Sequence, residues 1–235
     1  MSVRVQCPSC GGAVVFEVGS SIVAVCPYCR SAVARGDRTV ENLGKVADLV
    51  ETGAVLRIGL EGKFENRKFR LTGRTQLRHE AGGVWDEWYA SFGNDRWGWL
   101  SEAQGRFYML FAQDRASRDR EGAGILPAYS SLSPGDGVYL NEDSTRFVVA
   151  ETGTATANGA EGEIPYRLVP GSTYQFADLS GPGGEFATLD YSDGPPALYL
   201  GREITLDDLG IPENILREIY ELREVKAKKI NCPNC

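Results

Sequence analysis

The six cysteines of this 235-residue chain all fall in Cys-x-x-Cys pairs, and this pattern constrains the fold more than any other feature. Two of the pairs lie near the N-terminus: Cys7 with Cys10, and Cys26 with Cys29. Each pair can bring two sulfur atoms to one side of a metal ion, and two pairs at this spacing suit one tetrahedral Zn²⁺. A site with four protein thiolates has no open coordination position, so it cannot activate water. The sequence therefore predicts a structural zinc ion bound by Cys7, Cys10, Cys26 and Cys29.

The segment between these pairs predicts two short strands, 13–17 and 22–25, separated by a Gly-Ser-Ser turn. We interpret them as one hairpin with a cysteine knuckle at each end. The knuckle sequences CPSCGG and CPYCR resemble those of the zinc ribbon family, although Arg30 stands where a ribbon commonly has glycine. The resemblance implies a zinc ribbon over residues 1–36 and the four zinc ligands named above. A dithiol redox site is the alternative, but the surrounding sequence lacks the βαβ pattern typical of one.

The third pair, Cys232 and Cys235, ends the sequence and repeats the first, since KINCPNC follows the pattern of RVQCPSC. Two thiolates cannot complete a tetrahedral zinc site, so Cys232 and Cys235 are predicted to be an incomplete metal knuckle. Either residues 231–235 are the truncated first knuckle of a second ribbon, or they form a half-site that another chain completes. We favour the truncated knuckle, because the repeated letters indicate a repeated module.

The charge balance excludes some classes of partner. There are 25 Lys and Arg against 32 Asp and Glu, so the net charge of −7 disfavours broad nucleic-acid binding. No apolar run approaches the length of a transmembrane helix, and no charged-then-apolar leader precedes the first cysteine pair. We therefore expect a soluble, cytoplasmic protein without direct membrane insertion, in which the cysteines bind metal rather than form disulfides.

The rest of the sequence predicts a mainly β fold. A connector at 37–54 is expected to be partly helical, with a short helix over 41–50 indicated by the spacing of Leu43, Val46, Leu49 and Val50. Alternating apolar residues and Gly-containing turns predict two related antiparallel β units, 55–128 and 129–211, packed as a sandwich or as small barrels. A C-terminal helix is predicted over 212–230, with Pro212 at its first position.

A cluster of tryptophans is the first candidate for a binding surface; it comprises Trp85, Trp88, Trp97 and Trp99. Residues two apart on a strand share a face, so Trp97 and Trp99 lie together, as do Trp88 and Ala90. Large rings of this kind could form a platform for a sugar, another small ligand or a protein partner. The alternative, which we weight more heavily, is that they fill the core of a β domain.

Candidate catalytic groups are few. A polar stretch near the C-terminal half offers carboxylates to an enzyme, namely Asp178, Glu185, Asp190 and Asp193. The single histidine, His79, lies in a charged strand, which is typical of an exposed or locally bonded side chain. Asp86 and Glu87 are adjacent, so they point to opposite faces of a strand and cannot share a site. We expect both to be solvated or bonded to loop backbone. No nucleotide-binding or metalloprotease motif appears.

From Glu41 to Ile211 the chain resembles a bacterial family of uncharacterised proteins, the domain of unknown function 4178 group. The stretches that carry the resemblance are ENLGKVADL, FRLTGR, WDEWY, GWLSEAQG, GAEGEIPYRLVPGSTYQFADLSGPGGEFATLDYS and PPALYLGREITLDDLGI. The family has no established activity, so the resemblance implies none. The family is associated with gene neighbourhoods of polyamine-synthase-like enzymes and small membrane proteins, and this association implies an accessory role. We favour a non-enzymatic zinc-ribbon adaptor for protein partners, with a carboxylate-dependent enzyme and a ligand-binding module as alternatives. The oligomeric state stays open.

Overall fold

A computed structural model of the chain describes residues 2–36, 39–103, 105–113, 125–140, 145–192 and 194–228. The described part is mainly β, as the sequence predicts, and it contains one α-helix near its C-terminal end. The candidate carboxylate Asp193 and the predicted incomplete knuckle of Cys232 and Cys235 lie outside the described residues. Among the described residues, no helix is both long and apolar enough to cross a membrane.

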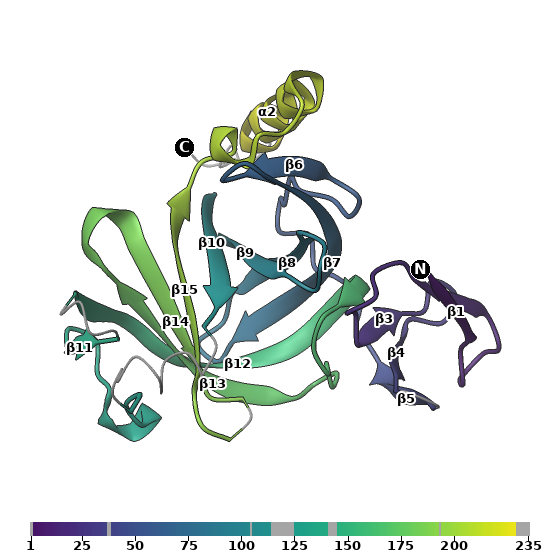
Figure 1. The fold of residues 1–235 in the computed structure, drawn as a ribbon, viewed down its shortest axis with the longest axis horizontal. Coiled ribbons are helices and arrows are strands. Elements are labelled where there is room, and N and C mark those ends of the chain that lie inside the picture. Colours follow the sequence, from purple (N-terminus) through teal and green to yellow (C-terminus); the bar gives the residue numbers. More distant parts are fainter. Residues whose placement is uncertain are drawn as a thin grey trace, which may run out of the picture.

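An eight-stranded antiparallel barrel forms the main body (Figure 1). Its strands are β7 (Arg67–His79), β8 (Val84–Ser91), β9 (Trp97–Ala103), β10 (Arg106–Ala112), β12 (Arg146–Ile164), β13 (Thr173–Ser180), β14 (Glu185–Asp190) and β15 (Ala197–Ile204). Strands β7 to β10 form one meander and β12 to β15 another, and the pairs β10–β15 and β7–β12 join the two. Each predicted β unit thus contributes half of a single barrel, rather than a sandwich or a barrel of its own.

Apolar side chains pack on the outside of this barrel. The outer face of β7 to β10 is covered by residues 54–60, by β6 (Glu61–Phe64), by the short helix η3 (Asp207–Leu209) and by α2 (Glu213–Lys228). Figure 1 shows α2 and β6 together at one side of the barrel. Trp88, Leu100 and Ile219 belong to this core, and Ile219 is 2% exposed. The predicted C-terminal helix is therefore confirmed as α2, and its apolar residues Ile215, Leu216 and Ile219 pack onto the barrel.

A second outer core covers β13 to β15. Val138 of β11 (Gly137–Tyr139) and Leu140 pack with Leu179 and Leu189, close to the short helix η1 (Tyr129–Ser131). Because successive strand residues point to opposite faces, apolar packing outside leaves the alternate positions to face the barrel interior. On β8, for example, Trp88 and Ala90 face outward while Trp85, Glu87 and Tyr89 face inward.

The cysteine-bearing segment forms two hairpins rather than the one that the sequence predicts. β1 (Val3–Gln6) pairs with β2 (Ala13–Phe16), and β3 (Val23–Val25) pairs with β4 (Ser31–Arg35). The two predicted strands exist as β2 and β3, but each belongs to a different hairpin. Each cysteine pair lies in the turn of its own hairpin, so the two knuckles can face each other across one site.

The helix predicted over 41–50 is wrong. This segment forms strand β5 (Val40–Lys45), which pairs with β4. Gly44 has φ of 118°, a left-handed value that a helix interior excludes, and it lies at a register shift opposite Ala32. The apolar spacing fits a helix, but the free edge of β4 offers backbone hydrogen bonds that override it. Val46, beyond the strand, is buried where this segment meets the barrel.

The two hairpins are joined to the barrel by backbone pairing and by one carboxylate. β3 pairs with the end of β12, so this sheet continues into the barrel. The Glu163 carboxylate, on β12, accepts hydrogen bonds from the backbone N–H groups of Glu17 at 2.7 Å and Val18 at 3.1 Å. Trp97 Nε1 also donates to Ser20 Oγ at 3.0 Å. The cysteine module is therefore part of the barrel's architecture rather than a loosely tethered unit.

Candidate metal centre and barrel cavity

The four N-terminal cysteines converge on one point. Their sulfur atoms all lie within 4.8 Å of one another. The Cys7–Cys29 pair is 3.6 Å apart and the Cys10–Cys26 pair 3.7 Å. A tetrahedral zinc ion with Zn–S bonds of about 2.3 Å places its sulfur ligands about 3.8 Å apart. The cluster therefore has the dimensions of a four-thiolate metal site, and these cysteines could bind a metal ion.

The described residues do not include the C-terminal cysteine pair. Cys232 and Cys235 both fall on residues that the structure does not describe, so the incomplete metal knuckle predicted for them stays a prediction. The metal cluster found among the described residues consists of the four N-terminal cysteines. Four sulfur ligands already complete a tetrahedral shell, so this site needs no ligand from Cys232 or Cys235.

The two knuckles of the cluster have the same backbone geometry. Gly11 N–H donates to Cys7 O at 2.9 Å, and Arg30 N–H donates to Cys26 O at 3.0 Å. Both residues have left-handed φ values, 73° for Gly11 and 62° for Arg30. Glycine adopts this conformation freely, whereas arginine does so at a cost. Arg30 is held there by a hydrogen bond to Ala47 O at 2.8 Å and an ion pair with Asp48 at 3.2 Å.

The donor set fits a structural ion. Cys7 and Cys26 are buried, with exposed fractions of 2% and 0%. Hydrogen bonding with Ser31 lowers the pKa of Cys29 to about 6, which favours the thiolate that a metal needs. At Cys10 a backbone hydrogen bond lowers the pKa, but the neighbouring thiols raise it to about 12 when no metal is bound. Four sulfur ligands fill a tetrahedral shell and leave no position for water or substrate. Such a site can link the two hairpins but cannot perform hydrolytic chemistry.

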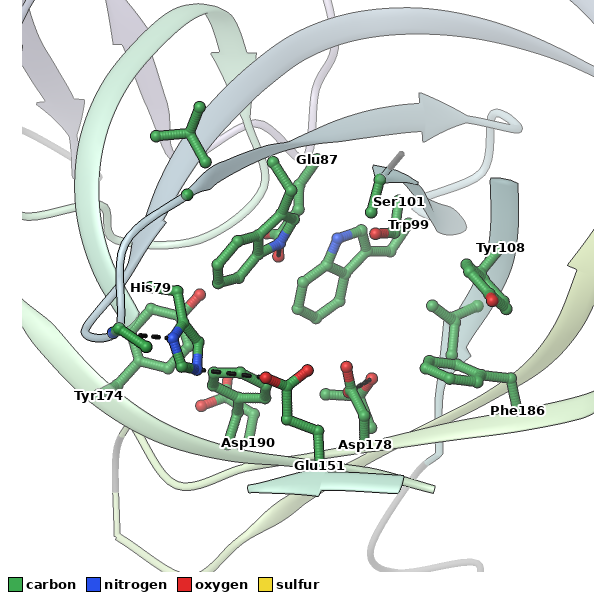
Figure 2. A pocket seen from close by; sticks show the side chains of 18 of the residues that line it. His79, Glu87, Trp99, Ser101, Tyr108, Glu151, Tyr174, Asp178, Phe186 and Asp190 are labelled. Carbon is green, nitrogen blue, oxygen red and sulfur yellow. Dashed lines mark hydrogen bonds and ion pairs between the residues drawn. The ribbon is translucent and has the colours of Figure 1, made fainter. Parts of the chain in front are cut away.

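The barrel interior contains a cavity of about 390 Å³ (Figure 2). Its walls come from β7 to β10 on one side and β12 to β14 on the other. A second hollow, of about 540 Å³, lies at the barrel end near Tyr166 and Leu168. Both are lined by Glu87, Trp99, Leu110, Tyr174 and Asp190. The two hollows thus flank the same ring of side chains, and we call them together the lumen.

Three carboxylates converge on the lumen. Glu87 on β8 accepts from Trp85 Nε1 at 3.0 Å, Asp178 on β13 accepts from Thr188 Oγ1 at 2.7 Å, and Asp190 on β14 accepts from the Ser192 N–H at 2.7 Å. Figure 2 shows Glu87, Asp178 and Asp190 around one space. These donors are neutral, and among the ion pairs of the described residues none includes Glu87, Asp178 or Asp190.

Burial changes the acid–base behaviour of these groups. It raises the pKa of Glu87 well above its usual range, and the charges of Asp190 and Asp178 add to the effect. It raises the pKa of Asp178 to about 7, with the Glu151 charge adding and the Thr188 hydrogen bond opposing. The pKa of Asp190 is also raised by burial. An ionised carboxylate is poorly solvated here, so these groups keep their protons to a higher pH than an exposed carboxyl group does.

Aromatic rings make up much of the remaining wall. Trp85 packs against Phe176 with ring centroids 5.8 Å apart, and Tyr108 against Phe186 at 4.3 Å. Trp99 meets Tyr199 edge-on at 4.6 Å. The Trp99 Nε1 atom is buried, and no acceptor among the described residues takes its hydrogen. The lumen therefore offers π faces and one unpaired donor beside its carboxylates.

His79 lies at the edge of the cavity, at the end of β7. Its Nδ1 accepts from the Ala81 N–H at 3.0 Å, and its Nε2 lies 3.3 Å from Glu151 Oε1. Gly153 on β12 makes room for the ring, because a Cβ there would collide with His79 Nε2. The sequence predicts an exposed or locally bonded histidine; Nδ1 is bonded, but Nε2 is buried and makes no hydrogen bond within the described residues, so the prediction holds only in part. The sequence does not predict that His79 lies beside the lumen.

The tryptophans do not form one platform. Trp85 and Trp99 line the 390 Å³ cavity, and Trp97 lines the other hollow. Trp88 is 0% exposed in the outer core, so no ligand can reach it. The strand face decides whether a ring is core or cavity wall: Trp88 fills a core, and a ligand or partner surface formed by the other tryptophans stays a prediction.

Of the carboxylates proposed for catalysis, the structure brings Asp178 and Asp190 together at the lumen. Glu185 is exposed and points away from the lumen. Asp86 and Glu87 do point to opposite faces, but neither is solvated: their exposed fractions are 1% and 4%. Asp86 pairs on the outer face with Arg74 at 2.7 Å.

Sequence reasoning missed Glu87, Tyr174 and Tyr199 as lumen residues. The alternation Trp85-x-Glu87-x-Tyr89 places Glu87 on the same face as two rings, and this signal was available in the sequence. It does not reveal that this face is the interior. That depends on which face the distant helix α2 covers.

Comparison with known proteins assigns the barrel region to a protein family. The family described as "Domain of unknown function (DUF4178)" matches residues 57–206, which span β6 to β15 and exclude the cysteine cluster and α2. No curated protein and no solved structure matches the chain significantly. The family match covers more than half of the chain, so the chain belongs to the DUF4178 family of proteins.

Proposed function

We propose that this protein is a zinc-stabilised barrel that binds a small organic ligand in its lumen. The observation that carries the proposal is the cavity of about 390 Å³, which is lined by aromatic rings, by the buried carboxylate of Glu87 and by the half-buried carboxylates of Asp178 and Asp190. Its size falls in the range of small-molecule sites, about 300 to 1,000 Å³. A barrel that served only as a scaffold would be expected to fill its interior with apolar side chains.

The polar residues of the lumen support a binding role because they oppose folding. Desolvating a carboxylate is unfavourable unless it is paired, and Glu87 is 4% exposed with neutral donors around it. The apolar outer cores show that the sequence can pack these strands well. Polar groups that break local packing rules concentrate at functional sites.

We assign the cysteine cluster to structural zinc. Four thiolates at tetrahedral spacing are the ligand set that zinc favours, and the ion would supply a cross-link between the two hairpins. Glu163 and the β3–β12 pairing then transmit this rigidity to the barrel. A thiolate site needs reduced cysteines, which supports a cytoplasmic location.

An adaptor role for protein partners is the second candidate. It is favoured by Tyr28, which stands in the second knuckle with 70% of its surface exposed. Aromatic residues are enriched in protein interfaces. Cross-linking and mass spectrometry in cell extract, with wild type and Tyr28→Ala compared, would test this role. Loss of a specific cross-linked partner in the variant supports it, and an unchanged set contradicts it.

Ligand binding is tested on the full zinc-loaded chain. A fragment library with neutral, anionic and cationic members is screened by thermal shift and tryptophan fluorescence, and hits are measured by calorimetry. Leu110, which lines both hollows, is replaced by tryptophan to fill the lumen. We expect Leu110→Trp to weaken hits by roughly tenfold or more, a loss of about 1.4 kcal/mol. Leu222→Trp, on the exposed side of α2, is the control.

Hits that bind wild type and Leu110→Trp equally would place the ligand elsewhere. A library without any hit would also contradict the proposal. Circular dichroism and zinc content show whether each variant has folded.

A further inference from the structure

We infer that the lumen selects an organic ammonium ion, held between its carboxylates and its aromatic rings. This inference rests on the proposed function and deepens it by naming the chemical class of ligand. It comes from three features of the lumen: the sign of its charge, the spacing of its carboxylates and the chemistry of the remaining wall.

The charge of the 390 Å³ cavity is one-sided. Among the described residues that line it, four are acidic, and none is lysine or arginine; the acids are Glu87, Glu151, Asp178 and Asp190. His79 is the one basic residue of this cavity, and it already lies 3.3 Å from Glu151 at the edge. The second hollow of the lumen also contains Arg167, whose guanidinium is paired with Glu41 at 2.8 Å. An anionic ligand would meet repulsion without a compensating cation, whereas a cationic ligand supplies the missing countercharge.

The spacing of the carboxylates argues against a bare metal ion. A calcium ion needs six to eight oxygen ligands at about 2.3 to 2.6 Å. Within the part of the chain that the structure describes, the cysteine cluster is the one place where three or more potential metal ligands converge closely enough. Glu87, Asp178 and Asp190 lie on three different strands around a wider space. A cation of several atoms can reach carboxylates that one metal ion cannot.

The carboxylates also have unused capacity for hydrogen bonds. A carboxylate can accept about four hydrogen bonds, and a primary ammonium group donates three. The donors that Glu87, Asp178 and Asp190 receive within the described residues are neutral hydroxyl, indole and backbone groups. An ammonium group in the lumen would add charge-assisted bonds, which are stronger than neutral ones.

The aromatic wall suits the same ligand. Trp85, Trp99 and Phe176 line the cavity beside the acids. A cation within about 6 Å of a ring centroid is attracted to the π face, and the alkyl part of an amine gains from burial against the rings. The buried, unpaired N–H of Trp99 is a hydrogen-bond donor, so it would pair with an acceptor elsewhere on the ligand and not with the ammonium group itself. An inorganic cation would use none of this apolar surface.

The test compares probes of one size and different charge on the full zinc-loaded chain at pH 8. The probes are n-butylammonium, 1,4-diaminobutane, n-butanol and butyrate, each measured by calorimetry and tryptophan fluorescence. We expect the amines to bind at least tenfold more tightly than n-butanol or butyrate. The comparison uses the wild-type protein, so it does not depend on a variant that folds.

Two variants then assign the charge to the lumen. Asp178→Asn and Asp190→Asn each remove one negative charge, and each should weaken amine binding at least tenfold at pH 8. Glu185→Gln, which removes an exposed carboxylate from the same strand as Asp190, should leave the affinity unchanged.

The outcomes separate the two proposals. If n-butanol or butyrate binds as tightly as the amines and Leu110→Trp still blocks binding, the lumen is a ligand site but its preference for cations is refuted. Amines that bind Asp178→Asn and Asp190→Asn as tightly as wild type would also refute it. If Leu110→Trp leaves every hit of the fragment screen unaffected, the proposed function itself fails.

Discussion

Replacing Asp178 by asparagine should stabilise the free protein above neutral pH, although it removes a half-buried, hydrogen-bonded side chain. In the folded state burial raises the pKa of Asp178 to about 7, from an ordinary value of 3.8. Between these two values the folded protein binds more protons than the unfolded chain. The free energy of unfolding therefore falls as the pH rises from about 4 to about 7, and the full penalty is present above pH 7.

The size of the penalty follows from the pKa difference. The shift from 3.8 to about 7 is about three pH units, and each unit is worth about 1.36 kcal/mol, so ionised Asp178 costs about 4 kcal/mol. Asparagine cannot ionise, and its oxygen can still accept the Thr188 hydrogen bond. Its amide hydrogens need new partners, which costs about 1 to 2 kcal/mol. We therefore expect Asp178→Asn to be more stable than wild type by about 2 to 3 kcal/mol at pH 8.

The assay is urea unfolding of both proteins at several pH values from 4 to 8, followed by far-ultraviolet circular dichroism. At pH 4 the wild-type side chain is protonated in the folded state, so the stabilising effect should be gone, and the variant should be less stable than wild type by about 1 to 2 kcal/mol, the cost of its amide hydrogens. Glu87, Asp190 and Glu151 face the same lumen with His79, Tyr108 and Tyr174, and they are present in both proteins. The charge of Asp178 also raises the pKa of Glu87, so the difference between the two curves reports Asp178 together with this coupling.

Parallel curves would refute this reasoning, because they would show that Asp178 does not change its proton affinity on folding. Glu185→Gln is the matched control. This carboxylate is exposed on β14, outside the lumen, and its removal should change stability by less than about 0.5 kcal/mol at every pH.

Three further predictions concern the cysteine module. Native mass spectrometry should find one zinc ion per chain. Removal of this zinc by a chelator should increase hydrogen exchange in β3 to β5 well before it does so in β8 to β10. Exchange that rises equally in all strands would contradict a local role of the metal. Glu163→Gln should destabilise the protein by about 1 to 3 kcal/mol in urea, because the amide cannot accept both backbone hydrogen bonds, without loss of zinc. Arg30→Gly should be more stable than Arg30→Ala by about 1 kcal/mol. Both variants lose the contacts to Ala47 and Asp48, but only glycine removes the strain of the left-handed backbone at residue 30. Equal stability of the two variants would show that this backbone is unstrained.

The cysteine cluster could be predicted because its information is local. Two Cys-x-x-Cys pairs with prolines and a glycine fix the ligand type, the number of ligands and the turn geometry within thirty residues. The strands of the barrel could be predicted for the same reason, from alternation over five to eight residues. The 41–50 segment could not, because its apolar spacing fits a helix and only the free edge of β4 makes it a strand.

The lumen could not be predicted because it depends on contacts between distant segments. Alternation separates Trp88 from Glu87 but does not say which of them faces inward. That is decided when α2 and residues 54–60 cover the face that bears Trp88, and when β7 pairs with β12 to close the barrel. The usual expectation places apolar residues inside and charged residues in water. This barrel has two apolar cores outside, while its interior holds carboxylates beside a further apolar cluster that includes Leu77 and Tyr89.

The position of the carboxylates inside the barrel also bears on where the stability of the protein comes from. The carboxylates of the lumen oppose folding, so the outer cores, the docked helix α2 and the metal module must offset them. A cation that enters the lumen removes part of the same penalty, and the relief contributes to its affinity. Substitutions that neutralise Glu87, Asp178 or Asp190 should therefore stabilise the free protein and weaken the ligand together. Substitutions in the outer cores, at Leu100 or Ile219, should instead lower both stability and binding, because they loosen the strands that hold the lumen open.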